Sequence, residues 1–504
     1  MNEVYDKKAY IKYVLGLFAI MGALFATKSV AFCFLGPIML MLGMRNPINL
    51  LYYLMMAIAM MMCNGHIVPK TFPFAVTQRL LMFAVAFLLS IQIFGRRKSA
   101  MITPFWGIMF FLIYMVIPSF LGWNWTISGL KLLLFTSVFL AYFGVANRII
   151  LHPQIRGAEV RSVFLAFATF FIVGSLMLIP FPSISLMNPF ELSVEQLTRY
   201  ISLFMGMTLH PQALGPIVTV LAISLFADLV FCVKRFNWLY VALLLISPYL
   251  VYKTGSRTAM GGLMAGLAVV VFIMINARGV ASQWRARIIG LSFLIAIVGT
   301  VVVLSVPSFR QKAVEFIIKF DKNAHSSDVT FEKVTVTRKG TVDESLYNFR
   351  QSPAIGNGFQ VSKAYAVHGK IPFRKLLSAP VEKGVWVTAV LEEGGVFGLI
   401  IFVGFAGSAI LLLWKRKSYI ALSTFITMLI LNLGEMTMFS MTSTGGLVWS
   451  VIFISSMLDA QRLKQGRVPN LPPSWMPGDG QFPFQSERAG LGEISRYSEG
   501  WNRT

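Results

Sequence analysis

Residues 257–276 read RTAMGGLMAGLAVVVFIMIN, and no charged side chain follows Arg257 within this stretch. A helix of this length crosses a hydrocarbon core of roughly 30 Å. Comparable apolar stretches recur along the chain, and 56% of its 504 residues are hydrophobic whereas 13% are charged. This composition excludes a soluble globular enzyme and predicts an all-α polytopic membrane protein.

The apolar stretches predict about 12–14 transmembrane helices. The lower number applies if the first two stretches form a short re-entrant pair. No cleavage site precedes or follows the first stretch, so we expect it to remain as a membrane anchor. The expected spans are residues 10–27, 29–44, 48–64, 77–95, 102–121, 129–147, 160–181, 211–233, 237–252, 257–276, 286–306, 386–413, 418–434 and 444–459.

Basic residues gather in every second loop of this scheme. Examples are Arg96–Lys98, Lys234–Arg235 and Lys415–Lys417, while the intervening short loops carry only isolated basic residues. The positive-inside rule assigns the basic loops to the cytoplasm, and both termini are then cytoplasmic. The net charge of +23 is explained by this orienting role, so we do not expect nucleic acid as a partner.

The cysteines Cys33, Cys63 and Cys232 have no metal-type spacing, so we expect neither a disulfide framework nor a zinc site.

The predicted topology divides the chain into regions and places its chemistry on the outer face. The regions are N-terminal transmembrane helices (1–181), a transmembrane core with outer-face arginine motifs (182–306), one large extracytoplasmic loop (307–385), C-terminal transmembrane helices (386–460) and a disordered cytoplasmic tail (461–504).

Arg199 lies in an expected outer-face segment. The spacing of apolar residues predicts an amphipathic helix over Pro189–Met205, and Arg199 falls nearly opposite its apolar face. A helix in the outer interface would hold Arg199 toward water or a polar cavity. The alternative is an ordinary surface arginine with Glu195 as a weak partner.

The turn after residue 252 carries a second outer-face arginine. Ser256 is a predicted N-cap of the next spanning helix, which puts Arg257 in its first turn. Cations usually avoid that end because the helix dipole is already positive there. An arginine at this place is useful if an anion such as a phosphate binds there, and Lys253 favours the same interpretation. The alternative is an interfacial anchor.

Further candidates lie near the outer ends of the predicted helices. His210 opens a helix from the outside and can line the same cavity. Glu392 and Glu393 fall early in a spanning helix, where carboxylates are costly unless they face a partner or a cavity. We interpret them either as partners of the outer arginines or as part of the site. The small residues of Gly262–Gly266 predict a helix-packing seam.

The expected extracytoplasmic loop contains two possible proton acceptors. A β-prone stretch at Val334–Val342 and a turn at Gln351–Phe359 precede them. His368 and Glu382 then follow, with Glu382 just before the next spanning helix. Either can take a proton from a substrate hydroxyl, and the alternative for each is a solvated surface residue.

Several of these elements recur together in a known family. They are Arg199 before His210-Pro211-Gln212-Ala213-Leu214-Gly215, the turn Thr254–Ala259, the large outer loop ending in Ser352-Pro353 with Gly356-x-Gly358, and the stretch Leu391–Gly398. In this order they resemble the bacterial O-antigen ligase and O-antigen polymerase superfamily of polytopic glycosyltransferases. The resemblance covers roughly residues 160–435, and the Ser-Arg-Thr-Ala turn is its most specific part.

The resemblance implies a GT-C-like fold in the bacterial inner membrane and an inverting glycosyltransferase that needs neither metal nor cofactor. Its donor would be an undecaprenyl-pyrophosphate-linked glycan, and its acceptor a sugar hydroxyl on a glycan or a lipid-linked glycan. Membrane lipids and other polysaccharide assembly proteins would be its partners. Arg199 and Arg257 would hold the pyrophosphate, with Lys253 and His210 beside them.

The chain departs from the family pattern at the expected base. Many members have a His-Asn pair where this chain has Pro380-Val381-Glu382-Lys383-Gly384. Glu382 is our first candidate for the base, and His368 is the second. A transporter or flippase for lipid-linked sugars is the competing function, and a structural membrane protein is a third. Polymerase and ligase activities cannot be separated from the sequence.

Overall fold

The computed structural model describes residues 4–27, 35–68, 84–88, 91, 102–152, 154–186, 203–233, 237–277, 331–361, 385–434, 437–440 and 444–465. The chain divides into two units, Met1–Gln461 and Arg462–Thr504. Of the second unit, only the residues that end the last helix are described.

Every regular element among the described residues is helical, apart from two isolated β-bridges. The longer helices are α1 (Lys7–Thr27), α3 (Pro47–Met62), α7 (Trp125–Leu151), α8 (Gly157–Met177), α11 (Pro211–Asp228), α12 (Trp238–Lys253), α13 (Arg257–Asn276), α16 (Phe331–Phe349), α19 (Trp386–Lys415), α20 (Tyr419–Leu431) and α21 (Thr444–Gln465). The short ones are α2 (Leu35–Gly43), η2 (Thr103–Gly107), α5 (Ile108–Tyr114), α6 (Val116–Leu121), α9 (Pro182–Ser185) and η4 (Leu229–Val233).

The described helices identify a multi-pass membrane protein. In the part of the chain that the structure describes, seven helical stretches are long and apolar enough to cross a membrane, and three further apolar helices are shorter. Exposed large apolar side chains cover their outward faces, as expected for surfaces in contact with lipid. The predicted all-α polytopic class is therefore confirmed.

Most predicted spans that fall on described residues form helices. Residues 257–276 coincide with α13, and residues 211–233 form α11 with the π-helical end η4. The span predicted at 102–121 is divided among η2, α5 and α6. The span 286–306 and most of 77–95 lie outside the described residues.

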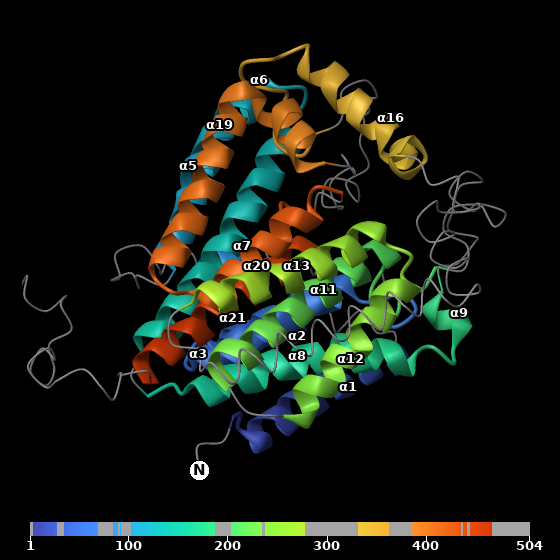
Figure 1. Cartoon of the computed structure of the whole chain (residues 1–504), viewed down its shortest axis with the longest axis vertical. Helices are drawn as coiled ribbons and strands as arrows, with labels where there is room; N and C mark the ends of the chain where they lie inside the picture. Colours follow the sequence, from blue (N-terminus) through green and yellow to red (C-terminus); the bar gives the residue numbers. More distant parts are fainter. Residues whose placement is uncertain are drawn as a thin grey trace, which may run out of the picture. The chain divides into compact units, whose positions relative to one another are not determined.

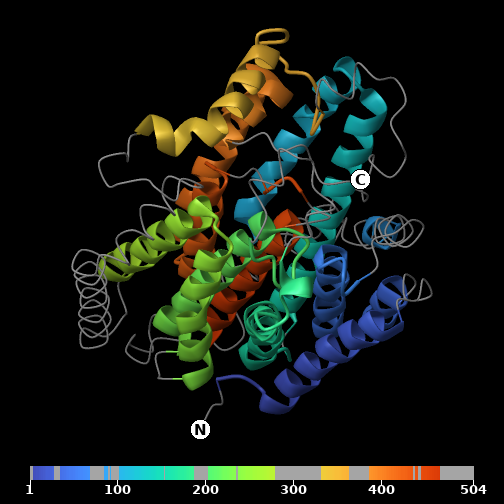
Figure 2. The ribbon, with the colours of Figure 1, turned by 90° about the vertical axis from the view of Figure 1, so that its right-hand side faces the viewer.

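The β-prone interpretation of Val334–Val342 is wrong, because these residues lie within α16. Strand propensity at valine and threonine is weak and is overridden by packing. Ser345 and Asn348, three residues apart, are buried, and α16 packs along α19. Figures 1 and 2 show this helix in yellow next to the orange α19.

Helix α11 runs opposite to α3, α8 and α12, as the contacts of their ends show. Met62 O at the end of α3 accepts from Leu209 N, and Ser175 Oγ near the end of α8 accepts from Met207 N. Lys253 O at the end of α12 accepts from Phe204 N. The last turns of α3, α8 and α12 therefore meet the residues that lead into α11. We call this side the His210 end of the bundle.

A buried ion pair joins three helices at the opposite side, which we call the Asp228 end. Arg161 of α8 donates from Nε to Asp228 Oδ2 at 3.0 Å and from Nη2 to Asp228 Oδ1 at 3.2 Å. Tyr240 of α12 donates its hydroxyl to Asp228 Oδ2 at 2.6 Å. Asp228 is the last residue of α11, so the ion pair fixes where that helix ends relative to α8 and α12.

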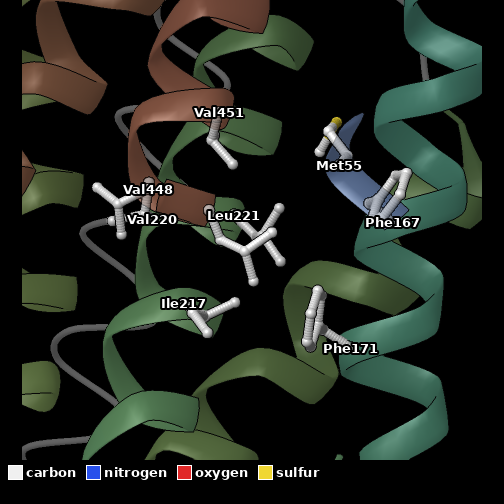
Figure 3. Close-up of a pocket in the computed structure, with 9 residues that line it drawn as sticks. Met55, Phe167, Phe171, Ile217, Val220, Leu221, Val448 and Val451 are labelled. Carbon is white, nitrogen blue, oxygen red and sulfur yellow. The ribbon is translucent and has the colours of Figure 1, made fainter. Parts of the chain in front are cut away.

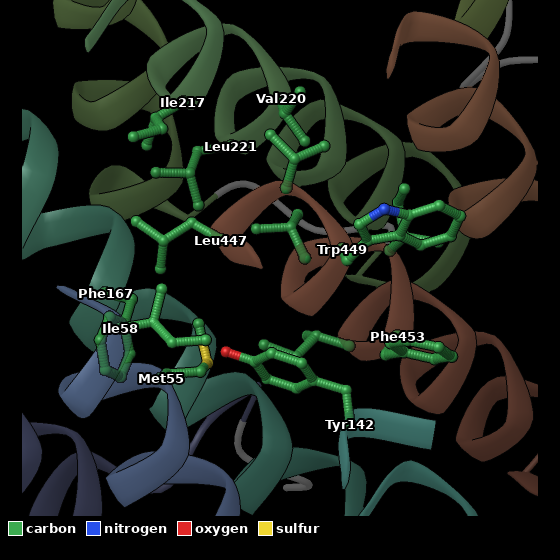
Figure 4. Packing of buried hydrophobic residues seen from close by; sticks show 14 of the residues in the cluster. Met55, Ile58, Tyr142, Phe167, Ile217, Val220, Leu221, Leu447, Trp449 and Phe453 are labelled. Carbon is green, nitrogen blue, oxygen red and sulfur yellow. The ribbon is translucent and has the colours of Figure 1, made fainter. Parts of the chain in front are cut away.

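Close side-chain packing holds the helices together, since lipid gives no hydrophobic drive for helix association. Trp449 of α21 lies edge-on to Phe139 of α7 and donates Nε1 to Met438 O at 2.8 Å. Figure 4 shows Tyr142 of α7 pointing its hydroxyl toward Met55 of α3, with Trp449 and Phe453 in the same buried cluster. The residues drawn in Figure 3 line a cavity in this region. Its volume is about 10 Å³, and its wholly apolar lining makes it a packing gap with no polar partner for water.

The predicted packing seam at Gly262–Gly266 is confirmed. A Cβ atom placed on Gly262 would lie 2.5 Å from Leu431 Cδ2, and one on Gly266 would lie 2.6 Å from Thr427 Oγ1. Both partners belong to α20, which packs along α13 beside α11 (Figure 1). The seam therefore holds α13 in a fixed position at the His210 end.

Candidate functional site

The turn Thr254–Arg257 has the predicted cap. Ser256 Oγ accepts from Ala259 N at 3.1 Å, so Ser256 caps α13 and Arg257 is its first residue. Thr254 Oγ1 donates to Val251 O at 2.7 Å and accepts from Ser256 N at 3.3 Å, which closes the turn. Thr254 and Ser256 are buried, whereas Arg257 is partly exposed.

His210 caps α11, the neighbouring helix. Its Nδ1 accepts from Gln212 N at 3.1 Å. Because this bond occupies the Nδ1 lone pair, the neutral ring carries its proton on Nε2. The side chain is partly exposed. The proton-bearing Nε2 of His210 therefore lies at this end of the bundle.

The two capped helix starts lie directly against each other. A Cβ atom on Gly215 would be 2.8 Å from Ala259 Cβ and 3.1 Å from Thr254 Oγ1. Thr219 Oγ1 also donates to Ala259 O at 3.0 Å. Each helix start carries the positive end of a helix dipole. Two of them side by side favour an anionic ligand.

Lys253 adds a second cationic side chain at this place. It ends α12, is exposed, and its ammonium group lies 5.7 Å from the centroid of the Tyr249 ring. Only the turn separates Lys253 from Arg257, and Gly255 has a φ of 64°, in the region that favours glycine. The structure thus brings together Lys253, Arg257 and the helix that His210 caps.

Arg199 lies outside the described residues, but the chain that follows it reaches the same turn. Phe204 N donates to Lys253 O at 3.4 Å, and a Cβ atom on Gly255 would lie 2.8 Å from Leu203 Cδ2. The predicted helix over Pro189–Met205 is wrong at its end. Phe204 forms a β-bridge with Leu186, so hydrogen bonds to neighbouring segments replace helical ones there.

Glu382 and His368 also lie outside the described residues. The chain resumes at residue 385, and Trp386 N donates to Asn432 O at 2.9 Å. A Cβ atom on Gly434 would lie 2.2 Å from Thr258 Oγ1, in the first turn of α13. Trp386, which follows Glu382 closely in the chain, is therefore connected through the end of α20 to the helix start that carries Arg257.

Helix α19 is interrupted in its first half. Gly395 has a φ of 65° and a ψ of −166°, which is not helical. Val396 N donates to Pro353 O at 2.9 Å and Phe397 N donates to Ala354 O at 3.3 Å. In an uninterrupted helix these two N–H groups would bond to the carbonyl groups four residues earlier.

The carbonyl groups of Glu392 and Glu393, which the break leaves without their helical donors, accept hydrogen bonds from the same loop. Asn357 N donates to Glu392 O at 2.9 Å, and Gly358 N donates to Glu393 O at 3.1 Å. Residues 353–358 therefore replace two helical hydrogen bonds by four hydrogen bonds to the loop, one for each backbone group that the break leaves without its helical partner. The sequence motifs Ser352–Gly358 and Leu391–Gly398 interlock as a result, although sequence reasoning predicted only a turn for the first.

The side chains of Glu392 and Glu393 are 3% and 2% exposed. Asn348 Nδ2 of α16 donates to Glu392 Oε1 at 3.1 Å. This contact fixes α16 to the interrupted part of α19. The structure thus gives Glu392 a partner in the insert, a possibility that the sequence did not raise.

Sequence reasoning missed the polar residues that hold these segments. Asn432 Oδ1 accepts from Thr437 N and Met438 N, at 2.6 and 2.9 Å. Lys131 of α7 is 6% exposed and donates from Nζ to Gln360 O at 3.0 Å. A polar residue within or at the end of an apolar stretch is the only signal that could have identified them.

Among the residues that the structure describes, no group of His, Cys, Asp and Glu side chains is arranged to hold a metal ion. The ligand that the described geometry suits is an anion. Comparison with known proteins gave no match, either to a protein-family model or to a curated protein.

Proposed function

We propose that this chain is a glycosyltransferase of the bacterial inner membrane, of the O-antigen polymerase or ligase type, with a GT-C-like fold and both termini in the cytoplasm. It moves a glycan from an undecaprenyl pyrophosphate donor to an acceptor sugar hydroxyl at the outer face. The observation that carries this proposal is the contact between the starts of α11 and α13, with Arg257 and Lys253 beside it.

The proposed site suits the departing pyrophosphate. The acceptor oxygen forms a bond to the anomeric carbon while the bond from that carbon to the phosphate oxygen breaks, which inverts the configuration. Negative charge grows on the phosphate oxygen as the bond breaks. The positive ends of two helix dipoles and a guanidinium group stabilise that charge more than they stabilise the intact donor.

His210 fits a binding role better than the role of base. A base needs a free lone pair, whereas the cap leaves His210 with its proton on Nε2. Nε2–H can donate to a phosphate oxygen. We therefore assign the role of the base, which takes the proton of the acceptor hydroxyl, to Glu382, with His368 as the second candidate. Arg199 joins Arg257 in holding the pyrophosphate.

The spatial pairing of distant motifs also supports the proposal. The His210 and Ser256 motifs meet at two adjacent helix starts. The Ser352–Gly358 and Leu391–Gly398 motifs interlock at the break in α19. These motifs carry the resemblance to the O-antigen ligase and polymerase superfamily, and their pairing gives each one a physical role.

The break in α19 is the one observation that favours a transporter or flippase. Interrupted helices in transporters direct unpaired backbone groups at a substrate. In α19, residues 353–358 bond to the backbone groups on both sides of the break. Because these backbone groups already bond to the loop, the break does not direct them at a substrate. The glycosyltransferase is therefore the better-supported function.

The test is glycan transfer by protein in lipid nanodiscs, supplied with a lipid pyrophosphate-linked glycan and candidate acceptors. We expect Arg257→Ala and Arg199→Ala to lose about 100-fold or more in kcat, as for other groups that stabilise charge in the transition state. Arg45→Ala is the matched control, because Arg45 is exposed and lies between α2 and α3, away from the site.

The same assay separates the two candidate bases. We expect Glu382→Gln to abolish the chemical step while binding of the donor remains. If only His368→Gln has this effect, the base is His368. Full transfer by the folded arginine variants would reject the pyrophosphate site.

A further inference from the structure

The residues that lead into α11 form an irregular segment, Phe204–Leu209, in which every N–H donates a hydrogen bond. Irregular backbone at the end of an apolar bundle needs such partners, because an unsatisfied group is costly there. The donations are Phe204 N to Lys253 O, Met205 N and Gly206 N to Ser185 O, Met207 N to Ser175 Oγ, Thr208 N to Met205 O, and Leu209 N to Met62 O.

One buried side chain joins this segment to its surroundings. Asn64, directly after α3, is fully buried. Its Nδ2 donates to Ile184 O at 2.5 Å and to Gly206 O at 3.0 Å, and its backbone N donates to Met207 O at 3.0 Å. Its Oδ1 accepts from His66 N at 2.9 Å. All the side-chain polar atoms of Asn64 are thus used.

The path of the segment past Asn64 depends on a glycine. Gly206 has a φ of 51°, and a Cβ atom on it would lie 2.6 Å from Ser175 Oγ. This conformation directs the Gly206 carbonyl to Asn64 while Met207 N reaches Ser175 Oγ. Asn64 therefore fixes the centre of the segment, and its two ends are Phe204 and Leu209.

We propose that Asn64 is a positioning residue for the anion site, a role that rests on the proposed function. One end of the segment reaches Lys253 through Phe204, and the other runs into His210, the cap of α11. By holding Gly206 and Met207, Asn64 sets the position of His210 relative to the Lys253–Arg257 turn. It does so without touching the ligand.

The discriminating variant is Asn64→Asp. A carboxylate keeps the size of the side chain and still accepts from His66 N, but it cannot donate to Ile184 O and Gly206 O. Asn46→Asp is the matched control at the start of the same helix. Asn46 is exposed and only accepts, from Ile48 N at 2.9 Å and Asn49 N at 3.4 Å, so a carboxylate suits it.

Hydrogen–deuterium exchange in nanodiscs tests the structural part of the proposal. We expect Asn64→Asp to raise the exchange rate of the amides of residues 204–209 about tenfold or more, because two buried acceptors lose their donor. Exchange in α13 and α20 should stay unchanged, and Asn46→Asp should match the wild type throughout. Unchanged exchange at 204–209, or an equal rise along the whole chain, would overturn the positioning role.

Binding of inorganic pyrophosphate, measured by calorimetry on the same samples, tests the link to the anion site. We expect Asn64→Asp to weaken the affinity about tenfold, and Asn46→Asp to leave it unchanged. Equal affinity of Asn64→Asp and wild type, or no binding by wild type, would overturn the proposal. Glycan transfer is measured separately, so a protein that binds pyrophosphate but transfers no glycan would contradict the proposed function alone.

Discussion

Ser256 and His210 show how a helix cap can belong to a ligand site. Each accepts a hydrogen bond from a backbone N–H two or three residues ahead, and each stands at the positive end of a helix dipole. The Ser256 cap was predictable because its partner is close in sequence. The role of Asn64 was not, because its partner Gly206 is 142 residues away.

Replacement of Ser256 by aspartate separates the cap from the anion site. Aspartate is as good a cap as serine, but Ser256 is buried, so we expect Ser256→Asp to fold with a thermal stability below that of the wild type. Its carboxylate would repel a bound pyrophosphate, and we expect the KM for the donor to rise about tenfold or more.

Ser256→Thr, which keeps the hydroxyl group and adds no charge, is the control for Ser256→Asp. Differential scanning fluorimetry and donor titration check the two variants. A donor KM for Ser256→Asp equal to that of the wild type would show that no anion binds at this cap.

At the scale of elements, α19 shows what sequence periodicity cannot predict. The stretch is apolar throughout and was predicted as one span, and the helix indeed extends over Trp386–Lys415. The break at Gly395 depends on hydrogen bonds from residues 353–358, which lie within the expected loop 307–385 and outside the apolar stretch itself. Only the unusual pair Gly394-Gly395 within an apolar helix hinted at it.

Gly395→Ala should destabilise the protein strongly. The backbone angles at Gly395 are almost restricted to glycine, and a Cβ atom would lie 2.2 Å from Ala354 O. We expect a loss of about 3 kcal/mol or more in the free energy of unfolding.

Gly407→Ala is the matched control in the same helix. A Cβ atom on Gly407 meets nothing within 4 Å, so this variant should be neutral or more stable by about 1 kcal/mol. Thermal unfolding in detergent compares the two variants, and equal stability would contradict the described break.

At the scale of the whole molecule, the sequence predicted the class, most of the described spans and the direction of α11 opposite to α3, α8 and α12. These follow from hydropathy and from the distribution of basic residues, which are properties of single stretches. The contact of the α11 and α13 starts could not be predicted in the same way. It depends on Gly215 meeting Ala259, a pairing that only the packed bundle defines.

The ion pair at the Asp228 end links α8, α11 and α12. Arg161→Leu or Asp228→Leu alone should cost about 3–5 kcal/mol, because each leaves the partner charge buried and uncompensated. The double variant should cost much less than the sum, since both charges are removed together. Unfolding measurements on the wild type, the two single variants and the double variant give the coupling energy. Additive losses in the free energy of unfolding would show that Arg161 and Asp228 do not stabilise each other.

The central claim is that the His210 end of the bundle holds a pyrophosphate while a glycan is transferred. The most direct measurement follows transferred glycan and released undecaprenyl pyrophosphate together, for wild type, Arg257→Ala and Arg45→Ala in nanodiscs. We predict that wild type and Arg45→Ala release one lipid carrier for each glycan transferred, and that Arg257→Ala loses both products about 100-fold. Equal turnover by folded Arg257→Ala, or no release of carrier by wild type with any donor, would contradict the account.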